Sequence, residues 1–200
     1  MTRLPPRNDH RQATEVSLIP YLNNTGITHP EHLLAGAFNI WGNTFPADEL
    51  PAGPSVMIDG IPFLFPAHAT GGPDNVRCEA QLVDLPVGRY DWIQLLCAAE
   101  RRTEDPIWLY YEDGTVESEW LRVSDFWPQT EPRFGEIAAF RLGRMHYPRH
   151  VERRMAPVIW RQRLPVPRPG ELSAVRLPDN PAIHLFAVTL LHTPAPAVIS

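Results

Sequence analysis

The stretch 124–128, Ser-Asp-Phe-Trp-Pro, holds the clearest candidate for chemistry in this chain. A carboxylate such as that of Asp125 can accept hydrogen bonds from hydroxyl groups, and the flat rings of Phe126 and Trp127 can stack on a sugar or another flat ligand. Binding residues concentrate in loops that follow regular elements, which is where this stretch falls. The alternative is structural: Asp125 caps the loop while both rings close the end of a core.

A second candidate is Met-His-Tyr-Pro-Arg-His at 145–150, within an arginine-rich stretch. Two histidines four residues apart would be separated by roughly 13 Å in a strand, at about 3.3 Å per residue. In a helix, Pro148 would begin the turn and leave His146 outside it. We therefore predict no metal site here. His146 and Tyr147 remain candidate ligand-binding residues, and the arginines form either an anion or partner surface or a solvated connector.

A third candidate is the loop 65–75, in which His68 and Asp74 could act as a general acid and base. The alternative is that Asp74 belongs to a turn leading into a strand. The sequence contains neither a nucleophile motif nor a phosphate-binding loop, so no cofactor is predicted. The catalytic candidates are His68, Asp74, Asp125 and His146, and their chemistry would be metal-independent acid–base catalysis.

The composition argues against several classes of partner. The net charge is −5 and no basic block occurs, which argues against nucleic acid. All 18 basic residues are arginines, so Schiff-base chemistry on a lysine is excluded. No apolar run approaches the roughly 20 residues of a membrane span, and no apolar segment follows the charged N-terminus as in a secretory signal. We therefore expect a cytoplasmic protein without a membrane partner.

The elements that must position these residues are expected to be short strands. The 23 prolines are spread along the chain and exclude long helices. Helical turns are expected at 46–50 and 148–154. We place a disordered lead at 1–15, a single domain at 16–193 and a flexible tail at 194–200. Strands are expected at 16–21, 37–41, 55–58, 61–65, 76–83, 90–98, 106–111, 115–123, 135–142, 158–166, 173–177 and 182–191.

The strongest local signal is a hairpin at 107–123, where Asp-Gly at 113–114 separates two runs rich in aromatic and β-branched residues. A two-residue turn would pair Tyr111 with Val116 and place Trp120 in the core. That register leaves later apolar residues outside, so we predict a bulge near Trp120 or a turn one residue longer.

Two further features concern assembly and cysteine chemistry. Trp108 and Tyr110 share the outer face of the hairpin, where they form either a stacking platform or the interface of a homodimer. Cys78 and Cys97 fall on the apolar phase of expected strands. Free buried thiols are therefore expected, with a disulfide as the alternative if the two strands are adjacent.

Several motifs follow one another along the chain: YLNNTGIT at 21–28, FPADELPAG at 45–53, GIPFLFP at 60–66, DNVRCEAQLVDLPVGRYDWIQLL at 74–96, YYEDGTV at 110–116, SDFW at 124–127 and LPDNPAIHLFAVTL at 177–190. Their order resembles galactose-binding-like jelly-roll modules of the kind appended to actinobacterial glycoside hydrolases. The resemblance implies an all-β, antiparallel jelly-roll β-sandwich that binds carbohydrate, with His184 in a core strand. The chain departs from those modules in its insert at 141–157 and in standing alone, which favours a cytoplasmic protein that reuses the fold.

The favoured hypothesis is non-catalytic binding of a carbohydrate or glycosylated small molecule at Asp125, Phe126, Trp127, His146 and Tyr147. Two alternatives stay open. One is a cytoplasmic enzyme of specialised metabolism that uses the histidine and aspartate candidates in a jelly-roll cavity. The other is an assembly protein that self-associates through its aromatic sheet face.

Overall fold

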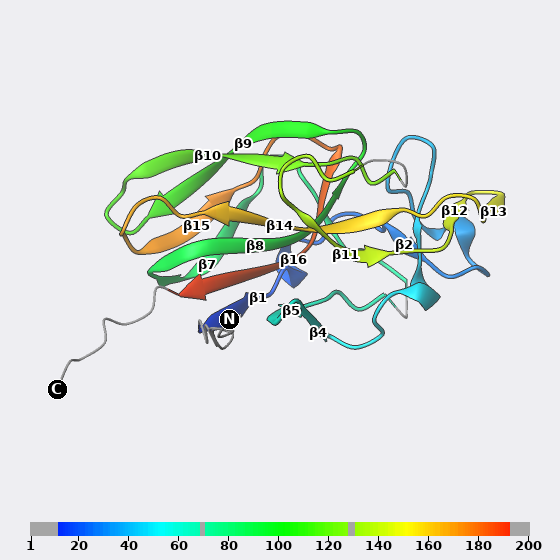
Figure 1. Cartoon of the computed structure of the whole chain (residues 1–200), viewed down its shortest axis with the longest axis horizontal. Coiled ribbons are helices and arrows are strands. Elements are labelled where there is room, and N and C mark those ends of the chain that lie inside the picture. Colours follow the sequence, from blue (N-terminus) through cyan, green and yellow to red (C-terminus); the bar gives the residue numbers. More distant parts are fainter. Residues whose placement is uncertain (1–11, 69–70, 128–130, 193–200) are drawn as a thin grey trace, which may run out of the picture.

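The computed structural model describes residues 12–68, 71–127 and 131–192, and its frame is a pair of antiparallel sheets packed face to face (Figure 1). The larger sheet has the order β1 (Ala13–Val16), β16 (Ile183–His192), β8 (Tyr90–Ala99), β14 (Val158–Pro165) and β11 (Ile137–Arg141), with β6 (Val76–Arg77) also paired to β16. The smaller sheet has the order β10 (Val116–Val123), β9 (Thr103–Tyr111), β15 (Leu172–Arg176) and β7 (Leu82–Gly88). The predicted all-β antiparallel sandwich is confirmed.

The main core lies between the two sheets and follows from the alternation of side chains along each strand. On β9, Ile107, Leu109 and Tyr111 are buried, and on β10 the same is true of Leu121 and Val123. Each fully buried aliphatic side chain contributes about 2 kcal/mol from the apolar area that it removes from water. This inner face therefore fixes which side chains of β9 and β10 point outward.

The register of the β9–β10 hairpin corrects one expectation and confirms its alternative. Val116 pairs with Tyr110 and not with Tyr111, so the turn is one residue longer than Asp-Gly alone. The amide of Gly114 donates to the carbonyl of Tyr111 at 3.0 Å, and Gly114 has φ +81°. The shift turns Val116 and Trp120 toward solvent, because neighbouring residues of a strand face opposite sides of the sheet.

A second core covers the other face of the larger sheet, because β8 and β16 carry buried side chains on both faces. From β8 and β16, Leu96, Ala98, Phe186 and Ala187 point into it. The covering elements lie at the right and bottom of Figure 1. They are β2 (Ile27–Thr28), β3 (Phe45–Pro46), β4 (Ser55–Ile58), β5 (Ile61–Leu64), β12 (Met145–Tyr147) and the 3-10 turn η3 (Ala47–Glu49), with β13 (His150–Glu152) and η2 (Leu33–Ala35) next to β12. A third 3-10 turn, η1 (Ile19–Tyr21), packs against the main core.

Two expectations about this cover are wrong and one is confirmed. Residues 37–41 form bends and a turn instead of a strand, because the Asn39 side chain accepts hydrogen bonds from nearby backbone amides. Residues 148–154 form no helical turn, because Tyr147 pairs with His150 across a two-residue turn in the β12–β13 hairpin. The helical turn expected at 46–50 is η3.

The boundary of the ordered domain is corrected at its start. Strand β1 begins at Ala13 and pairs with the last strand, so regular structure extends before residue 16. The expected strand at 16–21 is reduced to its first residue, because η1 occupies the end of that range. The rest of the expected lead, 1–11, and the expected tail, 194–200, lie outside the described residues.

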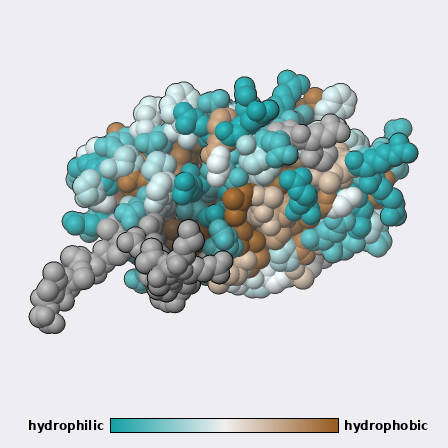
Figure 2. All heavy atoms as spheres, viewed as in Figure 1, coloured by the Kyte–Doolittle hydropathy of each residue, from teal (hydrophilic) through white to brown (hydrophobic). Residues whose placement is uncertain are grey.

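Cys78 and Cys97 are free and fully buried in the main core, as the sequence predicts. Burial raises the pKa of both thiols, because the charged thiolate is poorly solvated there. Hydrophilic residues cover most of the face shown in Figure 2, and hydrophobic residues form a band near its centre. Among the described residues, no helix is long and apolar enough to span a bilayer.

The left-handed backbone of the hairpin turn generates a stability prediction. A Cβ at position 114 would meet no atom within 4 Å, so Gly114→Ala adds only backbone strain. We expect it to lower the free energy of unfolding by about 1 kcal/mol. Gly53, which is equally open but does not have a left-handed backbone, provides the matched control. Urea unfolding that finds Gly114→Ala as stable as Gly53→Ala would contradict this reading of the turn.

Candidate functional site

A cleft of about 400 Å³ lies where the segment after β10 meets the turn 39–42 of the covering layer. It gathers side chains from four separate parts of the chain. Four of the five ligand-binding residues expected from the sequence line it, and His146 does not. The lining residues are Asn39, Trp41, Asn43, Glu100, Arg101, Asp125, Phe126, Trp127 and Tyr147.

The backbone on either side of Asp125 is fixed by the sandwich. The amide of Phe126 donates to the carbonyl of Ala99 at 3.0 Å, and the indole N–H of Trp160 donates to the carbonyl of Asp125 at 3.1 Å. Oδ1 of Asp125 accepts a hydrogen bond from the amide of Trp127 at 3.0 Å. One carboxylate oxygen therefore caps the loop, and no described residue donates to Oδ2, which can accept a hydrogen bond from a ligand.

The two aromatic residues of this loop have different roles. Phe126 is buried and packs edge-on against Phe38 and Phe45, with ring centroids 5.1 and 6.1 Å away. It closes the second core, as the structural alternative proposed. Trp127 is 41% exposed and meets Phe126 edge-on, at 6.2 Å and 75°. Its indole ring therefore offers a surface to the cleft.

Another part of the lining is a tight turn that presents Trp41. The amide of Gly42 donates to the carbonyl of Asn39 at 2.9 Å, and Oδ1 of Asn39 accepts from the amides of Trp41 and Asn43 at 3.1 and 3.2 Å. Gly42 has φ +67°, which permits the turn at little steric cost. Trp41 is 66% exposed on this rigid support. Asn43 is buried beside it, and its Oδ1 has no partner among the described residues.

Charged groups enter the cleft from the connection between β8 and β9. Glu100 and Arg101 both line it, and Arg101 has φ +71°, an uncommon conformation for a residue with a side chain. No described residue forms an ion pair or side-chain hydrogen bond with either group. With Asp125, the cleft therefore carries two carboxylates and one guanidinium.

His146 lies behind the cleft wall. It is fully buried, and its Nδ1 is 3.0 Å from Oγ1 of Thr28, while its backbone pairs with that of Thr44. Burial lowers the pKa of His146, and the nearby Arg144 lowers it further. Its neighbour Tyr147 reaches the cleft and stacks on His150, with ring centroids 4.9 Å apart. The alternation of side chains along β12 thus separates these two candidates.

His68 and Asp74 are both buried, and each side chain contacts a different part of the backbone. The Asp74 carboxylate accepts from the amides of Gly26 and Ile27, each at 2.9 Å, and burial raises its pKa to about 6. The ring nitrogens of His68 lie 3.2 Å from the carbonyl of Pro66 and 3.3 Å from that of Ala47. No hydrogen bond joins the two side chains in the described structure, so they do not form the candidate acid–base pair.

His184 is part of a polar network inside the protein. Nδ1 of His184 is 2.7 Å from Oδ1 of Asn75, and the ring lies over Phe38 with centroids 4.2 Å apart. The Asn75 oxygen must accept, because its amide nitrogen donates to Asp74 at 2.7 Å. His184 therefore carries its proton on Nδ1, and burial lowers its pKa to about 3. This supports the core position that the motif order implied.

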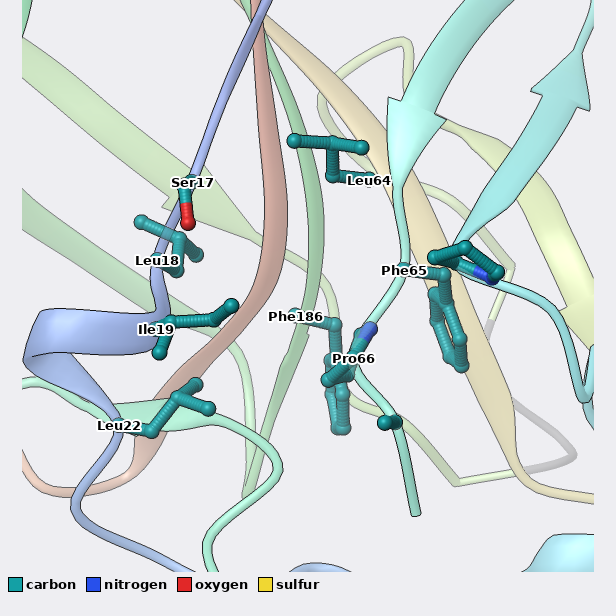
Figure 3. Close-up of a pocket in the computed structure, with 10 residues that line it drawn as sticks. Ser17, Leu18, Ile19, Leu22, Leu64, Phe65, Pro66 and Phe186 are labelled. Atoms are coloured by element: carbon teal, nitrogen blue, oxygen red, sulfur yellow. The ribbon is translucent and has the colours of Figure 1, made fainter. Parts of the chain in front are cut away.

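A separate apolar cavity of about 200 Å³ lies between the segment after β1 and the end of β5 (Figure 3). Ser17 contributes its only polar side chain among the described lining residues. Figure 3 shows Ile19 and Leu22 on one side, Leu64 and Pro66 on the other and Phe186 between them. The cavity thus lacks the polar groups that orient a hydrophilic ligand.

Within the described ranges, no group of three or more His, Cys, Asp or Glu residues could hold a metal ion.

Sequence reasoning missed the turn that carries Trp41 and the charged pair Glu100 and Arg101. A signal for the turn was present, since Asn39 and Gly42 enclose two apolar residues, as turn-forming residues do. The charged pair carried no local signal. It reaches the cleft only because the end of β8 lies beside Asp125, across a parallel bridge between Ala99 and Asp125.

The low pKa of His184 predicts how stability depends on pH. In the unfolded chain its ring takes up a proton near pH 6.5, so this stabilisation is complete above that pH and is lost as the pH falls toward 3. Within this window, wild type should lose about 1.4 kcal/mol more unfolding free energy per pH unit than His184→Gln. Urea unfolding measures the difference, with exposed His32→Gln as the control. Equal pH slopes for wild type and His184→Gln would contradict the buried neutral ring.

Comparison with models of protein families identifies the domain. Residues 11–194 match the model of the AziU2-like β-sandwich domain, which spans nearly the whole chain. No protein with a curated description matches the chain. The match supports the β-sandwich that the motif order implied, and it does not support the finer resemblance to galactose-binding-like modules. The chain belongs to the AziU2-like β-sandwich domain family.

Proposed function

We propose that the cleft beside Asp125 binds a saccharide, alone or as part of a glycosylated small molecule, without transforming it. The observation that carries this proposal is that Trp41 and Trp127 line one cleft together with carboxylate and guanidinium groups that form no ion pair with any described residue. Sugar rings have apolar faces that stack on indoles and hydroxyl edges that need several hydrogen-bond partners. The cleft offers both kinds of surface.

The two indoles support stacking because they are exposed on rigid backbone. An indole held in water by a hydrogen-bonded turn loses little further entropy when a ligand covers it. Trp41 is held by the Asn39 turn, and Trp127 follows directly on buried Phe126. Covering both rings would remove a large apolar area from water.

The polar groups support recognition of hydroxyls. Asp125 retains one oxygen without a described donor, and Glu100 and Arg101 have no side-chain partner among the described residues. Hydrogen bonds to charged groups contribute roughly 1.5–3 kcal/mol each, so loss of one should be measurable.

The positions of the histidines favour binding over the acid–base alternative. His146 is fully buried and His68 nearly so, with each ring held by internal contacts. A general base must come within about 3 Å of the proton that it removes. Neither ring lines the cleft. Acid–base catalysis in the cleft would therefore have to use Asp125 or Glu100 without either histidine.

The binding proposal is tested by calorimetric titration with methyl glycosides of glucose, galactose and mannose. Trp41→Ala and Trp127→Ala should each weaken binding by about tenfold or more, since each removes about 1.4 kcal/mol or more of stacking. Asp125→Asn should weaken it similarly, because the amide oxygen can still cap the loop while the charge is lost.

Trp120→Ala is the matched control, because this indole is 53% exposed and lies outside the cleft. It should bind the glycosides as wild type does. If wild type binds none of the three sugars, or if Trp127→Ala binds as tightly as Trp120→Ala, the proposal fails.

Self-association is a second candidate, and the hairpin register favours it. Trp120 joins Trp108 on the outer face of the smaller sheet, where both indoles are more than two-fifths exposed. Tyr110 beside them is partly covered by Arg176, whose Nε donates to its hydroxyl at 3.2 Å. We expect sedimentation of wild type to show a dimer that Trp120→Ala weakens. A wild-type monomer at high protein concentration would exclude this candidate.

A further inference from the structure

A second hollow adjoins the cleft and extends it. This hollow, of about 310 Å³, shares the lining residues Asn39 and Glu100 with the cleft. Both volumes fall in the range of roughly 300–1,000 Å³ that is usual for small-molecule sites. A ligand that extends from the cleft past Asn39 and Glu100 would therefore enter the hollow. The hollow is lined by Ala37, Phe38, Asn39, Ile40, Arg77, Glu100, Asn180, Pro181 and Ala182.

The chemistry of the hollow differs from that of the cleft. Its apolar walls are aliphatic, from Ala37, Ile40, Pro181 and Ala182, and the aromatic Phe38 beneath them is buried. Ile40 is 86% exposed on the same rigid turn that presents Trp41 to the cleft. A sugar ring would find no indole to stack on in the hollow, whereas an apolar group could cover Ile40.

Most polar side chains of the hollow already have a hydrogen-bond or ion-pair partner within the same molecule. Nε and Nη2 of Arg77 lie 2.9 and 2.6 Å from Oε1 of Glu79. The amide nitrogen of Asn180 donates to Asp105 at 2.8 Å, and its Oδ1 accepts from the amide of Ala182 at 3.0 Å. A second sugar would have to compete with these contacts, which lowers its net gain. Glu100 is the exception, and it also faces the cleft.

We infer that the ligand is a glycoside with an apolar aglycone. Its sugar ring lies in the cleft between Trp41 and Trp127, and the aglycone passes Asn39 and Glu100 to cover Ile40 in the hollow. The inference rests on the proposed saccharide site and adds the class of group attached to the sugar. An oligosaccharide is the competing occupant, and its second ring would meet the aliphatic wall.

The test compares three ligands that share one sugar: methyl β-D-glucopyranoside, hexyl β-D-glucopyranoside and cellobiose, with the galactose counterparts and lactose in parallel. Each buried methylene contributes about 0.8 kcal/mol, so partial burial of the hexyl chain should tighten binding at least about tenfold over the methyl glycoside. The disaccharide should bind no more tightly than the methyl glycoside. Calorimetry provides the dissociation constants.

Two variants test whether the hexyl group binds in the hollow. The first is the double variant Ile40→Ser/Pro181→Ser, which should fold because both positions are exposed. In this variant the hexyl advantage, the ratio by which the hexyl glycoside binds more tightly than the methyl glycoside, should fall to less than about threefold. Binding of the methyl glycoside should be unchanged. Ile19→Ser is the control, because Ile19 is 78% exposed at the separate apolar cavity. It should keep the full hexyl advantage.

The outcomes distinguish the two proposals. If no hexyl glycoside, no disaccharide and none of the methyl glycosides of glucose, galactose and mannose binds, both the saccharide site and this inference fall. If the methyl glycosides bind and the hexyl glycosides bind no more tightly, only this inference falls. It also falls if the disaccharides gain more than the hexyl glycosides, or if the hexyl advantage survives in Ile40→Ser/Pro181→Ser or disappears in Ile19→Ser.

Discussion

Strands β8 and β16 carry buried side chains on both faces, and the rest of the molecule is arranged around the need to cover them. The smaller sheet covers one face with a regular set of alternating apolar residues. The other face is covered by short strands and turns that have no core without it. Because those pieces come from residues 27–65 and 142–155, chain segments that are distant in sequence meet at the edge of the larger sheet.

The cleft is a consequence of that meeting. Phe38 of the cover packs against Phe126, which leaves the sandwich at the end of β10, and the ring of Phe38 also lies over His184. Buried polar contacts reinforce the junction, since Asp74 holds the backbone of Gly26 and Ile27. Exposed groups on both sides of this buried seam are therefore held at fixed positions, which is what a preorganised binding site requires.

How much the sequence could predict depended on how local each signal was. The hairpin at 107–123, the strands at 55–58 and 158–166 and the aromatic loop at 124–127 all follow from neighbouring residues, because alternation and turn chemistry act over short distances. Neither alternative for this loop describes both rings, because Phe126 closes the core whereas Trp127 is exposed. The length of the hairpin turn was left between two and three residues, because Asp-Gly is compatible with both.

Other residues were placed wrongly or missed because their positions depend on contacts that the local sequence pattern does not show. At 37–41 the apolar pattern suggested a strand, but the side chain of Asn39 provides hydrogen bonds that compete with strand pairing. His146 was chosen as a site residue for its chemistry, whereas its position on β12 turns it into the core. Glu100 could not be placed at the cleft from sequence, because its neighbourhood is set by the pairing of distant strands. Long-range packing, not local preference, decides such positions.

The most direct measurement is a titration of the protein with hexyl β-D-glucopyranoside or its galactose counterpart, followed by NMR of the tryptophan indole N–H groups. The assignment of each signal comes from single Trp→Phe variants. Binding in the cleft predicts that the signals of Trp41 and Trp127 move together as ligand is added, while those of Trp108 and Trp120 stay in place. Movement confined to Trp108 and Trp120, or no movement of any indole signal, would contradict it.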